Sequence, residues 1–238
     1  MGVSVQGATA IGRRRALGDA LSCGAVHTAP DMIVSHRHQF IFAAIPKTGT
    51  HSVRMALREH LADDDLEQVG LFVDKKLPFA ELAQLRHGHI GLAQIQPHLG
   101  AADFARYFKF AFVRNPFDRF VSYCAFITRD RGTFQEDPQR VMHRILFEMR
   151  PLHHVLFQPQ NTLLCREDGQ LLTDFIGRVE TMQASYDQIA SRIGIPTRTL
   201  DRINSSQRTD YRTYYDQRLI DGVSELYRRD LELFDYSF

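Results

Sequence analysis

The sequence of 238 residues contains no tryptophan, only three cysteines and no long hydrophobic run. Cys23, Cys124 and Cys165 are widely spaced and form no CxxC pair, so they predict neither a disulfide framework nor a zinc site. The longest apolar run, residues 40–45, is far shorter than the roughly 20 residues that cross a bilayer. No apolar segment follows the basic residues 13–15, as a signal peptide would require. We therefore expect a cytoplasmic chain without a transmembrane segment, with peripheral membrane association as the alternative.

Charge of one sign is also lacking, because 29 basic residues face 28 acidic ones and the formal net charge is +1. This balance excludes non-specific nucleic-acid binding, which needs a strong basic excess. Only four of the basic residues are lysines, and the others are arginines. Guanidinium groups bind phosphate and sulfate well, although a solvated surface explains the same composition. The four lysines are Lys47, Lys75, Lys76 and Lys109.

The apolar pattern predicts strands that alternate with helices. Buried strands are expected at residues 40–45, 107–113 and 175–179, and helices at 52–60, 118–127, 182–193 and 217–231. This order predicts an α/β fold in which helices flank a central parallel sheet. No internal linker divides the chain. We expect a mobile or peripheral tail over residues 1–36 and a single domain over residues 37–238.

A short polar loop joins the first predicted strand to the first predicted helix. Its sequence, PKTGTHS at residues 46–52, places a lysine, a glycine and hydroxyl side chains at a helix N-terminus. Free backbone amides and the helix dipole make such a junction an anion site. The loop differs from the Walker pattern, because the lysine precedes the glycine and no Ser or Thr directly follows it to hold magnesium. An ordinary capped loop is the alternative.

Two segments carry a family resemblance. IPKTGTHSV at residues 45–53 resembles the 5′-phosphosulfate loop of sulfotransferases that use 3′-phosphoadenosine 5′-phosphosulfate (PAPS). FAFVRNPFDRFVSYCAF at residues 110–126 is similar to the 3′-phosphate motif of the same family, in particular of its carbohydrate-type members. The resemblance implies a three-layer P-loop-like fold and a PAPS donor used without metal. The implied donor-binding residues are Lys47, Thr48, Gly49, Thr50, His51, Ser52, Arg114 and Ser122.

Two later segments also resemble this family. FIGRVE at residues 175–180 is like a conserved FVGRxE segment, and residues 204–215 are like a segment that closes over the nucleotide. The resemblance makes Ser206, Arg208 and Arg212 candidates for phosphate contact, with a polar surface loop as the alternative. Arg119 is a weaker phosphate candidate, and a surface ion pair with Asp118 is the expected use of its charge.

Sulfuryl transfer to a hydroxyl needs a base, and histidine suits that role at neutral pH. By resemblance His89 is the first choice, next to His87 in the sequence RHGHIGL. His153 and His154 are the rival pair, in a segment that in the family lines the acceptor pocket. We assign them to substrate binding together with Gln160. His51 has two possible uses, a contact with the sulfate or a place on the helix surface.

The resemblance implies an enzyme in which Lys47 and His89 are catalytic and the acceptor is a carbohydrate or glycolipid hydroxyl. A nucleotide-dependent kinase of similar fold is one alternative. It needs a metal-binding Ser or Thr in the phosphate loop and an acidic strand end, and neither is evident in the sequence. A non-catalytic nucleotide-binding relative is the other alternative, against which an intact Lys47, Arg114 and Ser122 weigh.

Overall fold

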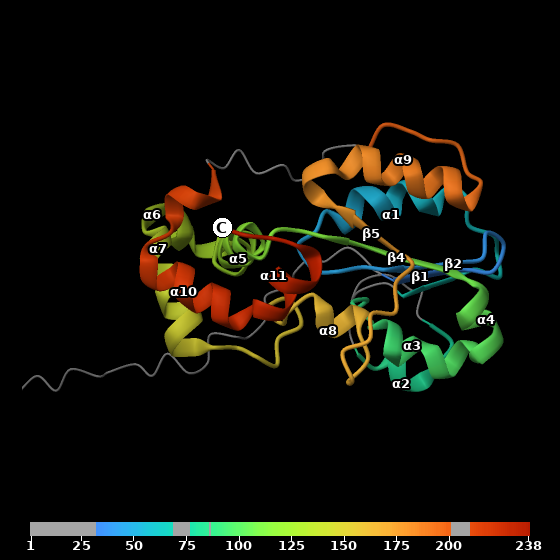
Figure 1. Ribbon diagram of the computed structural model, residues 1–238, viewed down its shortest axis with the longest axis horizontal. Coiled ribbons are helices and arrows are strands. Elements are labelled where there is room, and N and C mark those ends of the chain that lie inside the picture. Colours follow the sequence, from blue (N-terminus) through green and yellow to red (C-terminus); the bar gives the residue numbers. More distant parts are fainter. Residues whose placement is uncertain (1–31, 69–76, 86, 201–209) are drawn as a thin grey trace, which may run out of the picture.

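The computed structural model of the chain describes residues 32–68, 77–85, 87–200 and 210–238 (Figure 1). Five strands form one sheet in the order β3-β1-β2-β4-β5. Strands β2, β4 and β5 are parallel, whereas β1 runs antiparallel to both of its neighbours. The sheet is therefore mixed, which corrects the expectation of a parallel sheet throughout. The strands are β1 Met32–Ser35, β2 Phe40–Ala43, β3 Leu66–Gln68, β4 Phe108–Val113 and β5 Phe175–Arg178.

Strand β1 lies inside the segment that we expected to be a peripheral tail. It forms a hairpin with β2, in which Ser35 pairs with Phe40, and its other edge pairs with β3. Met32, Ile33 and Val34 are fully buried between the helix layers. The expected domain boundary at residue 36 is therefore wrong for residues 32–35. Residues 1–31 lie outside the described part of the chain.

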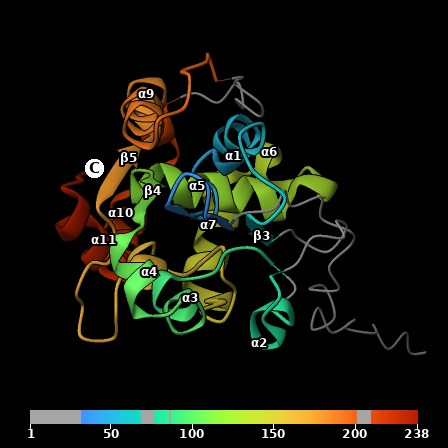
Figure 2. The ribbon, with the colours of Figure 1, turned by 90° about the vertical axis from the view of Figure 1, so that its right-hand side faces the viewer.

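Helices cover both faces of the sheet (Figures 1 and 2). Helices α1 and α9 cover one face, and α2, α3, α4 and α8 cover the other. The bounds of these helices are α1 Thr50–Arg58, α2 Ala80–Ala83, α3 Leu92–Leu99, α4 Ala101–Arg106, α8 Asn161–Leu164 and α9 Met182–Ile193. This confirms the expectation of an α/β fold with a sheet between helices.

The side chains of the strands explain why both faces are buried. Successive residues of a strand point to opposite faces of a sheet. Phe40 and Phe42 of β2 pack in the cluster with α1 and α9, whereas Ile41 and Ala43 pack on the opposite side. An apolar run without alternation, such as the one that begins at Phe40, is therefore what a central strand requires.

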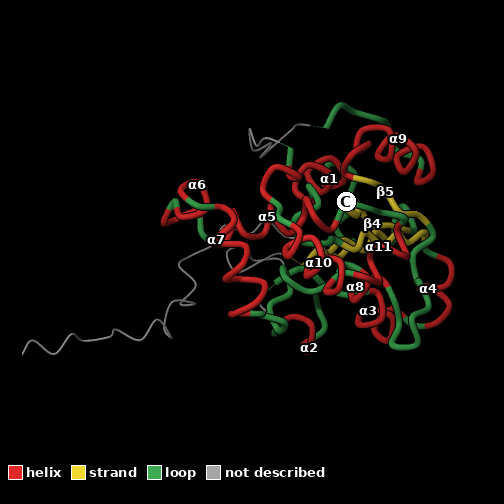
Figure 3. The backbone as a smooth tube through the Cα atoms, turned by 60° about the vertical axis from the view of Figure 1, so that its left-hand side comes forward, coloured by secondary structure: helices red, strands yellow, loops and turns green. Residues whose placement is uncertain are grey.

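Most of the remaining helices form a separate cluster beyond one end of the sheet (Figure 3). Its centre is α5 Pro116–Ile127, which follows β4 directly. No helix in the described ranges is long and apolar enough to span a membrane. The other elements of this part are α6 Thr133–Glu136, α7 Pro138–His143, α10 Gln217–Leu226, the 3₁₀ helices η2 Arg129–Arg131 and η5 Tyr211–Tyr214, and the π-helix η3 Arg144–Met149. Helix α11 Arg228–Phe234 joins this cluster to the sheet, because Leu231 packs on the cluster and Phe234 packs on the sheet. The 3₁₀ helix η4 Val179–Thr181 lies between β5 and α9.

The helix predicted at 217–231 is two helices, α10 and α11, with a break at Tyr227. Tyr227 has φ of −110° and ψ of 24°, outside the helical range. Its side chain is fully buried, and its hydroxyl donates a hydrogen bond to the carbonyl of Phe157 at 2.8 Å. The helix is therefore interrupted where Tyr227 contacts a distant loop, and the spacing of apolar residues along the sequence does not indicate this interruption.

Asp65 ties the β1–β2 hairpin to the segment before β3. Its carboxylate accepts hydrogen bonds from the hydroxyl of Ser35 and from the amides of His36, Arg37 and Ala62, at 2.6 to 3.2 Å. Burial by itself would raise the pKa of Asp65, but these hydrogen bonds together hold it below its usual value.

Asp65→Asn should therefore lower the free energy of unfolding at pH 7 by about 1.5–3 kcal/mol, because the amide cannot accept all these hydrogen bonds. A carboxylate with a lowered pKa in the folded state stabilises the fold above its unfolded pKa of about 3.9. This contribution is lost as the pH falls through the folded pKa. Urea unfolding at pH 7 and near pH 3 should show that the difference in free energy of unfolding between wild type and variant becomes smaller in acid. A difference that is the same at both pH values would contradict this role.

Candidate functional site

The predicted phosphate loop, residues 46–52, leads from β2 into the first turn of α1, and two of its residues have left-handed backbone conformations. Lys47 has φ of 68° and Gly49 has φ of 69°. Gly49 is the N-cap of α1 and has no side chain to cover the amides of the first turn. A Cβ atom at Gly49 would lie 2.4 Å from Cε of Met182, so glycine leaves room for the Met182 side chain as well as allowing the positive φ. A helix N-terminus thus follows a buried strand, which is an anion-binding arrangement.

The hydroxyl residues of this loop are buried. Thr48 donates a hydrogen bond from Oγ1 to the carbonyl of Ile45 at 2.9 Å, so its side chain shapes the loop. Thr50 and Ser52 lie in the first turn of α1 and are 8% and 6% exposed. The amide of Ser52 donates to the carbonyl of Gly49 at 3.2 Å. The structure thus places Thr50 and Ser52 in the first turn of α1 and Thr48 in the loop just before it.

His51 contacts the next turn of α1. Nδ1 of His51 lies 3.4 Å from Nη2 of Arg54. A guanidinium group has no acceptor, so Nδ1 accepts this hydrogen bond and Nε2 carries the ring proton. Arg54 in turn forms an ion pair with the buried carboxylate of Glu67 on β3. His51 is therefore a hydrogen-bond donor at Nε2.

The ammonium group of Lys47 lies against α5. Its Nζ atom is 4.0 Å from the centroid of the Phe126 ring, and the guanidinium of Arg129 lies 4.3 Å from the same centroid. Two cationic groups thus share one aromatic ring. The lysine of the phosphate loop and the last turn of α5 therefore lie side by side.

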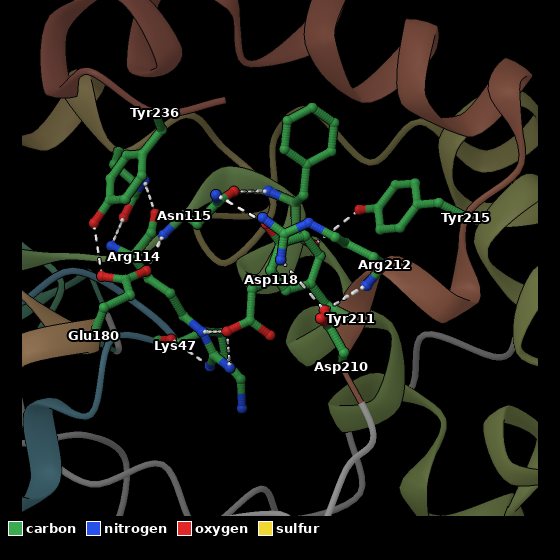
Figure 4. Close-up of polar contacts among 12 residues, drawn as sticks. Lys47, Arg114, Asn115, Asp118, Glu180, Asp210, Tyr211, Arg212, Tyr215 and Tyr236 are labelled. Carbon is green, nitrogen blue, oxygen red and sulfur yellow. Dashed lines mark hydrogen bonds and ion pairs between the residues drawn. The ribbon is translucent and has the colours of Figure 1, made fainter. Parts of the chain in front are cut away.

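Arg114 connects the two predicted phosphate segments (Figure 4). Its Nη1 atom donates to the carbonyl of Lys47 at 3.3 Å. Its Nε and Nη2 atoms each lie 2.6 Å from Oδ2 of Asp118, in the first turn of α5. Ser122 is one further turn along, on the same side of the helix as Asp118. The structure therefore brings Lys47, Arg114 and Ser122 to one edge of the sheet.

The segment that follows β5 supports the loop after β4. Glu180 accepts a hydrogen bond from the amide of Asn115 at 2.8 Å and another from the hydroxyl of Tyr236 at 2.8 Å. Arg178 donates to the carbonyl of Phe234 at 2.6 Å. The sequence FIGRVE thus acts through side chains that hold neighbouring backbone in place (Figure 4).

Arg212, on η5, lies near the loop that follows β4. Its guanidinium is 4.5 Å from the centroid of the Tyr211 ring, and the Tyr211 hydroxyl accepts a hydrogen bond from Nδ2 of Asn115 at 3.2 Å. Arg212 is itself exposed. The predicted phosphate contacts Ser206 and Arg208 lie outside the described residues.

His89 is fixed to the strand that leads into the phosphate loop. It is 6% exposed, and its Nδ1 atom lies 2.9 Å from the carbonyl oxygen of Ala44. A carbonyl can only accept, so Nδ1 carries the proton in this hydrogen bond. Nε2 is then the ring nitrogen that can take a proton in the neutral histidine. Ala44 directly follows β2 and precedes Lys47 by three residues.

The rival histidines have different surroundings. His153 is exposed, whereas His154 is half-buried and its Nδ1 atom lies 3.0 Å from the hydroxyl of Tyr123 on α5. Burial lowers the pKa of His154, and the nearby rings of His153 and His89 lower it further. His154 is therefore held against α5, two residues before Leu156.

Gln160 differs from its expected role at the acceptor. It is fully buried, with Oε1 accepting from the amide of Arg114 at 3.0 Å and Nε2 donating to the carbonyl of Arg114 at 2.9 Å. The backbone N–H of Gln160 donates to the buried carboxylate of Asp230 at 2.6 Å. Its side chain therefore holds the Arg114 backbone and does not line an open surface.

The expectation that Arg119 forms a surface ion pair with Asp118 is wrong. Arg119 is 2% exposed and donates from Nε to the carbonyl of Pro46 at 3.0 Å. Nη2 donates to the carbonyls of Leu156 and Gln158 at 3.1 and 2.9 Å. A guanidinium group thus joins the phosphate loop to the segment after His154. Residues on nearly every side of α5 are buried, so the helix sequence offers little solvated surface for this arginine.

The described part of the chain contains no group of three or more His, Cys, Asp or Glu side chains that could hold a metal ion. Lys47 and Arg114 contact each other at this edge of the sheet, and His89 is bound to Ala44, three residues before Lys47.

Comparison with known proteins identifies the class. A family model described as the sulfotransferase family matches residues 30–237. The chain belongs to the sulfotransferase family, which makes it a transferase of sulfuryl groups. The match begins just before β1, in agreement with the place of this strand in the sheet. Neither the comparison with curated proteins nor the comparison with solved structures found a match for this chain.

Proposed function

We propose that this chain transfers the sulfuryl group of PAPS to a hydroxyl of a carbohydrate or glycolipid by in-line displacement. The supporting observation is the contact between Nη1 of Arg114 and the carbonyl of Lys47, which joins two segments far apart in the sequence. These segments follow β2 and β4, which are neighbouring parallel strands. Ligands of α/β sheets bind outside the carboxyl ends of such strands.

The donor would lie across this edge in a P-loop-like manner. The start of α1 would bind the 5′-phosphosulfate, with Lys47 placed to neutralise charge on the departing 5′-phosphate oxygen. Arg114 and Ser122 would bind the 3′-phosphate, and Asp118 would orient the guanidinium. The full proposed donor-binding set is Lys47, Thr48, Gly49, Thr50, His51, Ser52, Arg114, Ser122, Ser206, Arg208 and Arg212.

His89 is the proposed base. The acceptor oxygen attacks sulfur, the bond between sulfur and the 5′-phosphate oxygen breaks, and the hydroxyl proton passes to Nε2 of His89. The hydrogen bond from Nδ1 to Ala44 fixes the tautomer that this step needs. His153 and His154 would face the acceptor, while Gln160 would hold the backbone of Arg114.

Donor recognition gives a direct test. The chain should bind 3′-phosphoadenosine 5′-phosphate at least about tenfold more tightly than 5′-AMP, a difference of about 1.4 kcal/mol, because AMP lacks the 3′-phosphate. Calorimetry with EDTA present should give the same affinity as calorimetry with magnesium.

The variant Arg114→Ala should reduce the difference between the two nucleotides, whereas Arg166→Ala, an exposed arginine near α8, should not. Equal affinities in the wild type, or binding that requires magnesium, would contradict the proposed donor and favour a kinase. Transfer of radiolabelled sulfate from PAPS to a panel of methyl glycosides and glycolipid micelles would then identify the acceptor.

A further inference from the structure

The two histidines at the site hold their ring protons on different nitrogens. His89 donates from Nδ1 to the carbonyl of Ala44, so Nε2 is its acceptor nitrogen. For His154 the partner is the hydroxyl of Tyr123, which can donate or accept. The tautomer of His154 therefore depends on where the proton of Tyr123 lies.

The burial of Tyr123 decides this question. Its side chain is 2% exposed, and its hydroxyl has one hydrogen bond within the described ranges, the one to Nδ1 of His154 at 3.0 Å. A buried hydroxyl proton without an acceptor is costly, so the hydroxyl donates to Nδ1. Burial also raises the pKa of Tyr123 above its ordinary value, which keeps the proton on the phenol. Nδ1 of His154 is therefore unprotonated, and its Nε2 carries the hydrogen.

The positions of the two rings are set by the same framework. Arg119 joins Pro46, in the phosphate loop, to Leu156 and Gln158, which follow His154. His89 is bound to Ala44, two residues before Pro46, and His154 lies two residues before Leu156, so this framework holds both histidines. Two histidines of opposite hydrogen-bonding character thus lie near each other beside the phosphate loop.

We propose that His154, oriented by Tyr123, donates a hydrogen bond from Nε2 to a second oxygen of the acceptor, next to the hydroxyl that loses its proton to His89. This inference rests on the proposed function and narrows its acceptor class. The acceptor carries two neighbouring oxygens, as in a vicinal diol of a sugar. Tyr123 is a positioning residue, because it acts through His154.

Long-range ¹H–¹⁵N correlation spectra of the imidazole rings test the tautomers directly, in the protein without added nucleotide. At pH 7.5 we expect His154 in the Nε2–H form and His89 in the Nδ1–H form. In Tyr123→Phe the fraction of His154 in the Nδ1–H form should rise, since the donor to Nδ1 is gone. Tyr186→Phe is the matched control, because this buried hydroxyl on α9 has no hydrogen-bond partner among the described residues. An Nδ1–H form of His154 in the wild type would overturn the proposal.

Kinetics with the methyl glycoside of highest turnover test the recognition. Tyr123→Phe should raise its KM about three- to tenfold and change kcat less than about twofold, as expected for one hydrogen bond. For the wild type, one monodeoxy form of this glycoside should have a higher KM than the parent glycoside. For His154→Ala, the KM values of the parent and of this monodeoxy form should be about equal, because the hydrogen bond is already lost. A Tyr123→Phe variant that lowers kcat at unchanged KM would overturn the proposal. The spectra need no sulfuryl transfer, so a failure of donor binding or turnover would be distinguished from a failure of this inference.

Discussion

His89→Ala is expected to lower kcat by about 10²–10⁴ while the affinity for 3′-phosphoadenosine 5′-phosphate stays within about twofold. A base contacts the acceptor hydroxyl and not the adenosine, so only the transfer step should suffer. The acidic limb of the pH–rate profile should disappear in the same variant, because the group that must be deprotonated is absent. Steady-state kinetics across pH, together with calorimetry on the nucleotide, measure both effects.

Two further variants make this result specific. His98→Ala removes a histidine of α3 that stacks on Phe79, and it should leave kcat close to that of the wild type. His154→Ala should raise the KM of the acceptor more than it lowers kcat. An inactive His154→Ala beside a nearly normal His89→Ala would move the base to His154.

Lys47→Ala should lower kcat by about 10²–10³, because the ammonium group would stabilise charge that develops on the leaving phosphate only as the bond to sulfur breaks. The nucleotide product should still bind, since the amides at the start of α1 and the Arg114 side chain are retained. Single-turnover kinetics with radiolabelled PAPS separate this loss from slow product release.

Phe126→Leu is a matched control, because it removes the ring against Lys47 and keeps the charge. It should change kcat by less than about fivefold. Arg114→Ala should act mainly on nucleotide affinity, in contrast to Lys47→Ala. Near-normal turnover of Lys47→Ala with a good acceptor would show that this lysine does not stabilise the leaving group.

Much of the framework of the site could be predicted from the sequence. The continuous apolar runs at β2 and β4, each followed by a polar loop and a helix, indicated buried parallel strands whose carboxyl ends meet. Helix α9 lies where its periodicity placed it. Because parallel neighbours bring their following loops together, Lys47 and Arg114 could be expected at one edge.

The remaining features depend on tertiary contacts that leave little local signal. Strand β1 has only three apolar residues in a row and lies next to a polar turn, so its burial depends on pairing with β2 and β3. Gln160 looks like any polar loop residue until Arg114 is placed against it. The break at Tyr227 likewise coincides with a contact to a loop about 70 positions away in the sequence.

Arg119 has a consequence for how acceptor preference can change in evolution. Its three hydrogen bonds all end on backbone carbonyls, of Pro46, Leu156 and Gln158. A carbonyl is present whatever the side chain, so exposed positions near His154, such as Leu152 and His153, can exchange their side chains while the segment keeps its attachment to the phosphate loop. New acceptor contacts can therefore arise by substitution there without moving the groups that hold the donor. The constraint falls on backbone path and segment length, so insertions and deletions between His154 and Gln158 should be tolerated far less well than substitutions.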